Sequence, residues 1–123
     1  MKAQQARRRA LALGPVMDAP ESKLEADFYT REIWPGIRSG EIVECEMHKT
    51  FQLLPPGEYC GIKLHKAEYT PDFWIKRRNG TVEVIEVKSK AVRRLQKSYV
   101  YRRRLFIELY ARPNGWAFRE IIE

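Results

Sequence analysis

The sequence has no apolar run that approaches the roughly 20 residues needed to span a bilayer. Residues 1–9 are polar and basic, and the apolar stretch at residues 10–13 is too short for the core of a secretory signal. We therefore expect a cytoplasmic protein without a membrane partner. Cysteine is scarce, and in that compartment we expect Cys45 and Cys60 to be reduced.

Acidic residues are too few to balance the basic ones: 16 Asp and Glu stand against 23 Lys and Arg, which gives a net charge of +7. This imbalance favours a polyanionic partner, although charge alone does not distinguish nucleic acid from other partners. A chain of 123 residues, 44% of them hydrophobic, is large enough for one folded domain and too short for two. We assign residues 1–20 to a basic N-terminal arm and residues 21–123 to the folded domain.

A helix is predicted to begin at residue 21 or 22 and to end at Gly40. Ser22 and Glu25 have the spacing of a capping box, in which the hydroxyl and the carboxylate bind unpaired backbone N–H groups. Pro35 is expected to kink or end this helix early. The apolar positions that would form its buried face are Leu24, Phe28, Ile33 and Ile37.

Further along the chain, β-branched and aromatic residues predict three strands, and a helical period then predicts a second helix. A final strand follows the turn at Asn114-Gly115. These elements span residues 42–54, 68–76, 81–88, 92–111 and 116–122. Arg112-Pro113 is expected to end the second helix, whose apolar face would consist of Val92, Leu95, Tyr99, Phe106 and Leu109. The order helix, three strands, helix, strand favours an α/β fold in which a mixed central sheet is flanked by helices.

Two acidic residues, Asp72 and Glu86, interrupt stretches that are otherwise aromatic or aliphatic. The Asn79-Gly80 pair predicts a two-residue hairpin turn, which places Asp72 opposite position 87, beside Glu86 and Lys88. A bulge would shift this register by one and bring Asp72 directly against Glu86 or Lys88. In either register the two carboxylates and the Lys88 ammonium group lie close together.

Two carboxylates that meet on neighbouring strands repel each other unless a cation lies between them. Mg²⁺ is a hard ion that prefers oxygen ligands and keeps open positions for water and a phosphate oxygen. Lys88 would then orient the attacking water or stabilise negative charge in the transition state. The alternative is structural, namely a buried or edge salt bridge that joins Lys88 to Asp72 or Glu86.

The order Pro71-Asp72, thirteen intervening residues, and Glu86-Val87-Lys88 resembles the motif of the PD-(D/E)XK nuclease superfamily. Four segments more closely resemble small phage-type nucleases, which include Holliday-junction-resolving enzymes. These segments are residues 22–25, 69–73, 84–88 and 103–106. Similar enzymes often carry Gln in the strand after the first helix, where this chain has His48.

The resemblance implies a restriction-endonuclease-like fold and a DNA endonuclease that depends on Mg²⁺, with Mn²⁺ as a substitute. It also implies an acidic residue from the first helix, for which Glu25 is the candidate, although Glu25 alternatively serves the capping box alone. Ser22 and His48 are accessory candidates. The candidate catalytic residues are Glu25, Asp72, Glu86 and Lys88, and the candidate metal ligands are Asp72, Glu86, Glu25 and the Val87 carbonyl.

The resemblance further implies a branched DNA substrate, most specifically a Holliday junction cut by two symmetric incisions. Paired cutting of this kind calls for a homodimer. If a phage encodes the protein, the expected compartment is the host cytoplasm. Two alternatives stay open: a non-catalytic DNA-binding module of the same fold, and a nicking or restriction-like nuclease that acts on linear double-stranded DNA.

Residues 87–105 contain eight Lys and Arg side chains and no Asp or Glu. Such a run forms either a solvated face or a surface that contacts the DNA backbone without reading bases. The same two interpretations apply to the N-terminal arm. The candidate DNA-binding residues are Lys90, Arg93, Arg94, Lys97, Arg102, Arg103 and Arg104, with Arg7, Arg8 and Arg9 of the arm.

A zinc site is a further alternative, because Cys45, His48, Cys60 and His65 have plausible ligand spacings. Cys45 and His48 are three residues apart, so a regular strand would point them to opposite faces. We therefore expect packing cysteines and surface histidines.

Overall fold

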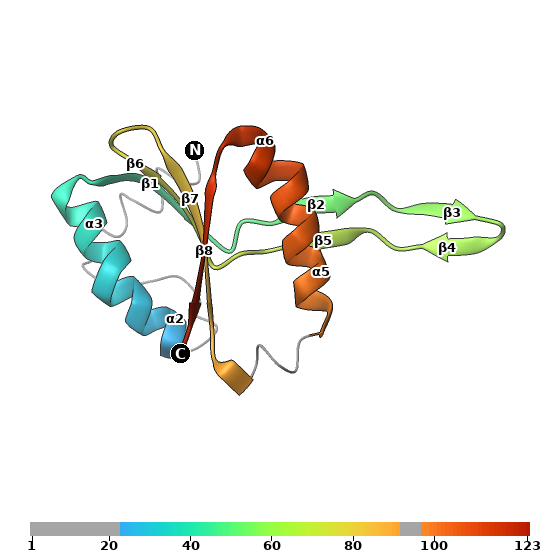
Figure 1. The fold of residues 1–123 in the computed structure, drawn as a ribbon, viewed down its shortest axis with the longest axis horizontal. Coiled ribbons are helices and arrows are strands. Elements are labelled where there is room, and N and C mark those ends of the chain that lie inside the picture. The colour runs from blue at the N-terminus through green and yellow to red at the C-terminus, as the bar shows by residue number, and fades with distance from the viewer. Residues whose placement is uncertain (1–22, 92–96) are drawn as a thin grey trace.

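The computed structural model describes residues 23–91 and 97–123, and its centre is a four-stranded mixed sheet (Figure 1). The strand order is β1-β6-β7-β8, in which β6 is antiparallel to both β1 and β7, and β8 is parallel to β7. These strands are β1 (Ile42–Met47), β6 (Phe73–Arg77), β7 (Val82–Lys88) and β8 (Ala117–Ile122). The predicted α/β architecture with a mixed central sheet is confirmed.

Two helical layers cover opposite faces of this sheet (Figure 1). The first consists of α2 (Lys23–Phe28), η1 (Tyr29–Ile33) and α3 (Trp34–Ser39). The second consists of α5 (Lys97–Phe106), η2 (Ile107–Ala111) and α6 (Arg112–Asn114). No helix within the described ranges is long and apolar enough to cross a membrane.

The alternation of side chains along β7 divides the hydrophobic core into two clusters. Ile85 packs with the first helical layer, whereas Val84 packs with the second. The predicted buried face of the first helix is confirmed at Phe28, Ile33 and Ile37, each 1% exposed. In the second layer Tyr99 and Phe106 are buried as expected, but Leu109 is largely exposed because it points outward from η2.

Helical backbone continues through Pro35 and Pro113. Of the two outcomes expected at Pro35, a kink or an early end, the early end is therefore wrong, and so is the end expected at Arg112-Pro113. Each proline is preceded by a π-helical segment, η1 or η2, and helical backbone continues through it. In both cases the N–H just before the proline bonds to the carbonyl five residues earlier. A proline ring clashes with the carbonyl four residues before it, and the wider π turn accommodates that clash. Gly40 ends the first helix as predicted, with a φ of +83°.

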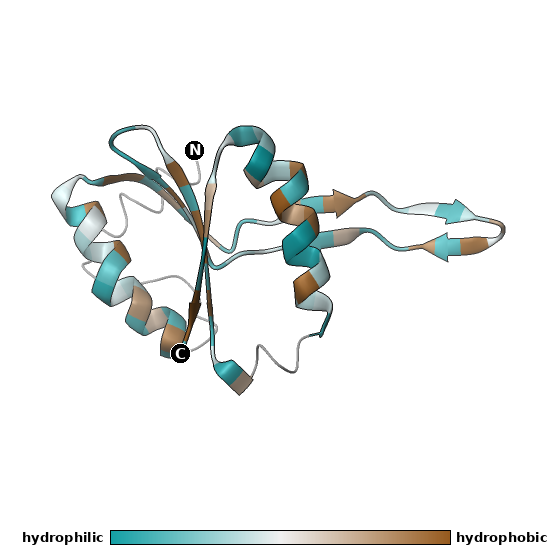
Figure 2. Cartoon of the chain, in the orientation of Figure 1, coloured by the Kyte–Doolittle hydropathy of each residue, from teal (hydrophilic) through white to brown (hydrophobic). Residues whose placement is uncertain are grey.

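The strands predicted at residues 42–54 and 68–76 are each broken in two. Their outer parts, β2 (Phe51–Leu54) and β5 (Ala67–Tyr69), pair with each other away from the main sheet. With β3 (Gly57–Tyr59) and β4 (Ile62–Leu64) they form a hairpin extension over residues 51–69, which projects from the sheet and carries several apolar residues (Figures 1 and 2). β3 and β4 were not predicted, because all their residues are exposed and show no alternation of burial.

The turn between β6 and β7 is a three-residue loop, residues 78–80, rather than the predicted two-residue turn. Gly80 at its end has a φ of +90°, as the left-handed residue of such loops does. The pairing of β6 with β7 is therefore shifted by one residue from the predicted pairing. When the observed pairing is extended by one residue pair, Asp72 lies opposite Glu86. This is the shifted register that the sequence left open.

Candidate metal and catalytic site

The candidate site lies where the sheet meets the base of the hairpin extension. The His48 N–H donates to the Asp72 carbonyl at 3.1 Å, one pair beyond the last paired residues of β1 and β6. Asp72 and Glu86 extend the register of β6 with β7 in the same way. His48, Asp72 and Glu86 therefore form one row across three neighbouring strands, where side chains of adjacent strands interact.

Pro71 explains why regular pairing stops at this row. Proline has no N–H, so the ladder between β6 and β7 cannot continue through it. The Val87 N–H, which the register places opposite Pro71, instead donates to Asp72 Oδ2 at 2.7 Å. The N–H and C=O of one strand residue point to the same neighbouring strand, so the Val87 carbonyl also faces Pro71. Pro71 has no N–H to donate to this carbonyl.

Glu25 and His48 form what we call the histidine side of the site. Glu25 lies on α2 and is 1% exposed, and its Oε1 is 2.5 Å from His48 Nε2. His48 has a φ of +55°, which takes it out of strand alternation and allows its ring to reach α2. The same ring nitrogen lies 4.0 Å from Asp72 Oδ1. One donor atom from each of these three residues lies within 4.8 Å of the other two, so together they could hold a metal ion.

Glu86 and Lys88 form the lysine side of the site, on the face that α5 covers. The Tyr69 hydroxyl donates to Glu86 Oε1, and Lys88 Nζ lies 3.9 Å from Glu86 Oε2. Lys88 Nζ also lies 4.6 Å from the centroid of the Tyr99 ring, within the range of a cation–π interaction. The ammonium group is thus held between a carboxylate and an aromatic face.

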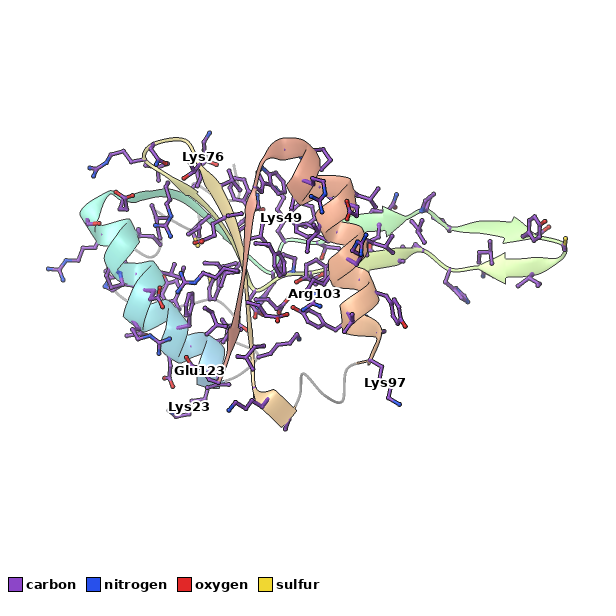
Figure 3. The ribbon with its side chains drawn as sticks, in the orientation of Figure 1. Lys23, Lys49, Lys76, Lys97, Arg103 and Glu123 are labelled. Carbon is purple, nitrogen blue, oxygen red and sulfur yellow. The ribbon has the colours of Figure 1, made fainter. Side chains whose placement is uncertain are left out.

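A second layer of polar contacts supports the lysine side. The Tyr99 hydroxyl donates to Glu120, which also accepts from Arg103 Nη1 at 2.7 Å. Glu120 is the β8 residue that pairs with Glu86, so it continues the row onto the fourth strand. Figure 3 shows Arg103 between α5 and the sheet, where its positive charge balances Glu120.

Burial and the proximity of Asp72 raise the pKa of both glutamates. Burial is the larger cause in each case, and together the two causes raise the pKa of Glu25 from 4.5 to about 7 and that of Glu86 from 4.5 to about 9. The hydrogen bond from Tyr69 acts in the opposite direction on the Glu86 pKa. Because ionised carboxylates this close repel one another, a divalent cation bound among them would lower these pKa values and relieve the repulsion.

The structure brings Glu25, Asp72, Glu86 and Lys88 together, as the sequence predicted. The carboxylate of Glu25 points into this group, so the interpretation that it only caps the helix is wrong. His48, predicted only as an accessory residue, contacts two of the four. The candidate positions that lie outside the described residues are Ser22, Arg7, Arg8, Arg9, Arg93 and Arg94.

Three residues of the site were not identified from the sequence: Tyr69, Tyr99 and Glu120. Tyr69 stands three positions before Asp72, and that closeness in the chain was a usable signal. Tyr99 was assigned to the apolar face of its helix, and it is 1% exposed, but its hydroxyl and ring also serve polar contacts. No sequence pattern marked Glu120, because its position in the site depends on the pairing of β8 with β7.

The basic residues that follow β7 differ in their surroundings. Lys90 and Lys97 are exposed, and Figure 3 shows Lys97 at the start of α5, pointing away from the sheet. Arg102 is partly buried. Arg103 is bound to Glu120, and Arg104 forms an exposed pair with Glu108 at 2.9 Å. The exposed members remain suited to a DNA contact, whereas Arg103 also has a structural partner.

The cysteines and histidines do not form the alternative zinc group within the part of the chain that the structure describes. Cys45 is buried in the core, as expected for a packing cysteine. Cys60 is exposed in the turn between β3 and β4, so its prediction as a packing residue is wrong. His65 is an exposed histidine as predicted, but His48 is not, because it is partly buried in the candidate site.

The sequence of this chain matches a known family model. A family model described as a protein of unknown function, DUF1064, matches residues 16–121, so the chain belongs to that family. The match covers the N-terminal helix, the sheet and the second helical layer. No curated protein and no solved structure matches the chain.

Proposed function

We propose that this protein is a metal-dependent DNA endonuclease with a restriction-endonuclease-like fold. The observation that carries the proposal is that Asp72, Glu86 and Lys88 converge at one end of the sheet, with Glu25 beside them. The central sheet with helices on both faces agrees with the resemblance of this motif to the PD-(D/E)XK superfamily. The proposed substrate is branched DNA, most specifically a four-way Holliday junction.

The residues present fit a divalent cation. Asp72 would hold it together with Glu25, Glu86 and the Val87 carbonyl, and these oxygen donors are the ligands that Mg²⁺ prefers. We propose Mg²⁺ as the cation, with Mn²⁺ as a substitute. When bound, such an ion supplies a water of lowered pKa and neutralises charge on the phosphate.

Hydrolysis adds one water to a phosphodiester: the water oxygen bonds to phosphorus, one P–O ester bond breaks, and the departing alkoxide takes up a proton. The Lys88 ammonium group would bind a phosphate oxygen and stabilise the negative charge that develops there. Asp72 is held by the Val87 N–H, and Glu86 by the Tyr69 hydroxyl. Both carboxylates are therefore oriented before any substrate binds, as catalysis by positioning requires.

The DNA backbone would approach along the basic residues that follow the catalytic strand. Lys90 and Lys97 are exposed there, and Arg104 lies on the exposed face of α5. Contacts to phosphates position DNA without reading its sequence, which suits recognition of a branched shape. Two symmetric cuts require two active sites, so we also propose that the protein acts as a homodimer.

The test compares cleavage of a labelled four-way junction with that of a linear duplex of the same sequence, in Mg²⁺ and in EDTA. We expect the junction to be cut only with the cation, and we expect Asp72→Asn to abolish cutting while junction binding is retained. Asp27→Asn is the matched control, because Asp27 is an exposed carboxylate of α2 that pairs with Lys23. It should cut at the wild-type rate.

Each of the other outcomes selects a different function. Equal cutting of linear duplex and junction would indicate a nicking or restriction-like nuclease. Binding without cleavage in either Mg²⁺ or Mn²⁺ would indicate a non-catalytic DNA-binding module and would reject the endonuclease proposal.

A further inference from the structure

His48 places a nitrogen donor within a group of oxygen donors. Its Nε2 lies 2.5 Å from Glu25 Oε1 and 4.0 Å from Asp72 Oδ1, and its side chain is 19% exposed. We propose that His48 is a metal ligand together with Glu25 and Asp72, and that the site, which the proposed function assigns to Mg²⁺ with Mn²⁺ as a substitute, therefore binds a first-row transition cation such as Mn²⁺ more tightly than Mg²⁺. This inference rests on the proposed function, because it concerns the cation of the same site.

The placement of the imidazole supports this role. The His48 backbone donates to the Asp72 carbonyl, and its φ of +55° carries the ring out of the strand toward Glu25. The three donors come from separate parts of the chain, α2, the segment after β1 and the residue before β6, yet they converge within 4.8 Å. The ring nitrogen is therefore close to both carboxylates, as a ligand of a shared metal ion must be.

The chemistry of the donors predicts the choice of cation. Mg²⁺ takes oxygen ligands almost exclusively and keeps several waters, whereas imidazole binds first-row transition ions. Mn²⁺ is the most stringent test of this preference, because it binds a given site more weakly than the other divalent first-row transition ions do. It also accepts carboxylate oxygens, so it suits all three side chains.

The alternative is a hydrogen bond between His48 and Glu25 with no role in metal binding. Pulsed electron paramagnetic resonance of the wild-type protein loaded with Mn²⁺ separates the two, because a coordinated imidazole couples its ¹⁴N nucleus to the metal spin. Calorimetric titration with Mn²⁺ and with Mg²⁺ then measures the discrimination. The variant is His48→Gln, whose amide can still bond to Glu25, and the matched control is His65→Gln on the hairpin extension.

We expect ¹⁴N coupling in the wild-type protein and in His65→Gln, and its loss in His48→Gln. Removal of a ligand should lower Mn²⁺ affinity by about 10-fold or more, since even residues that only orient a ligand contribute about that much. Mg²⁺ affinity should change far less. Absence of nitrogen coupling in the wild-type protein would overturn the proposal, as would an equal loss of affinity for both cations in His48→Gln.

The measurement on wild-type protein decides the question even if His48→Gln does not fold. The experiment also separates this inference from the proposed function. Nitrogen coupling in a protein that cuts no DNA would reject the nuclease and leave the metal site, whereas cutting in Mg²⁺ without nitrogen coupling would do the reverse.

Discussion

Glu25 and Glu86 are both buried carboxylates beside Asp72, yet their other neighbours differ. Glu25 meets the imidazole of His48, which can bind a metal through its ring nitrogen. Glu86 meets a phenol that donates to it and the ammonium group of Lys88. Under the proposed function, His48 would add a nitrogen ligand on the histidine side, whereas Lys88 would bring a positive charge to the phosphate on the lysine side.

On both sides, the same two causes disfavour the ionised form of the glutamate. In each, burial and the charge of Asp72 raise the pKa of the glutamate, so without a cation the site retains protons that free glutamates would have lost. The Lys88 ammonium group lowers the pKa of Glu86, as a salt-bridge partner does, but burial and Asp72 outweigh it. Strongly perturbed pKa values are often found at functional sites, which supports the proposed function.

Among substitutions that change only one side of the site and leave Asp72 in place, Lys88→Met should have the largest effect. Lys88→Met should lower the cleavage rate at saturating cation by about 10²–10³-fold, the usual effect of removing one group that stabilises transition-state charge. Its cation affinity should stay near that of the wild type. Glu25→Gln should instead raise the cation concentration required for half-maximal cleavage, with partial recovery at high cation. Single-turnover rates measured across a cation titration give both quantities.

Lys76→Met is the control for the lysine substitution, because Lys76 lies on β6 at the far end of the sheet (Figure 3). It should behave as the wild type does. Lys88→Met is expected to change mainly the cleavage rate, and Glu25→Gln mainly the cation requirement. If both variants changed both quantities to the same extent, the separate roles assigned to the two sides would be wrong.

A second prediction concerns stability and pH in the absence of cation. The folded-state pKa values of Glu25 and Glu86, about 7 and about 9, lie above the value of 4.5 for an unperturbed glutamate. The folded protein therefore binds protons more tightly than the unfolded chain, and the resulting stabilisation is present below pH 4.5 and lost as the pH rises through 7 and then 9. We therefore expect the free energy of unfolding to fall as the pH rises across this range.

Urea unfolding in EDTA between pH 5 and 10 measures this loss, over a range that includes the pKa values of both glutamates. Asp72→Asn should reduce the pH dependence, because it removes the second cause of both shifts. Addition of Mg²⁺ or Mn²⁺ should stabilise the wild-type protein more at pH 9 than at pH 5, because protons compete with the cation. A stability that increased with pH in EDTA would contradict the assigned directions.

The sequence predicted those parts of the site that depend on local pattern. Polar residues at apolar positions of two adjacent strands identified Asp72 and Glu86, and alternation along one strand placed Lys88 with Glu86. The register was open by one residue, because Asn79-Gly80 is compatible with loops of two lengths. The structure resolved it through the three-residue loop, which aligns Asp72 with Glu86.

The remaining parts depend on contacts between distant segments. The role of His48 depends on a left-handed backbone that no strand pattern predicts. Glu120 reaches the site through the parallel pairing of β8 with β7, and sequence alternation does not specify which residues of two parallel strands lie side by side. The outer part of the hairpin extension, β3 and β4, was missed because an exposed two-stranded hairpin has no buried face to mark it. Burial leaves a periodic signal in the sequence, whereas long-range register does not.

The smallest expected effect tests the support of Glu86 by Tyr69. Tyr69→Phe removes the hydroxyl that donates to this carboxylate, which should destabilise the protein by about 1–2 kcal/mol and slow cleavage by about 10-fold or less. Because the lost hydrogen bond lowered the pKa of Glu86, that pKa should rise further, so the pH profile of cleavage should move to higher pH. Tyr59→Phe on the hairpin extension, where the side chain is 70% exposed, is the matched control and should change neither quantity. A rate lowered without any shift of the pH profile would show that the Tyr69 hydroxyl does not act through the pKa of Glu86, and would contradict this account of its role.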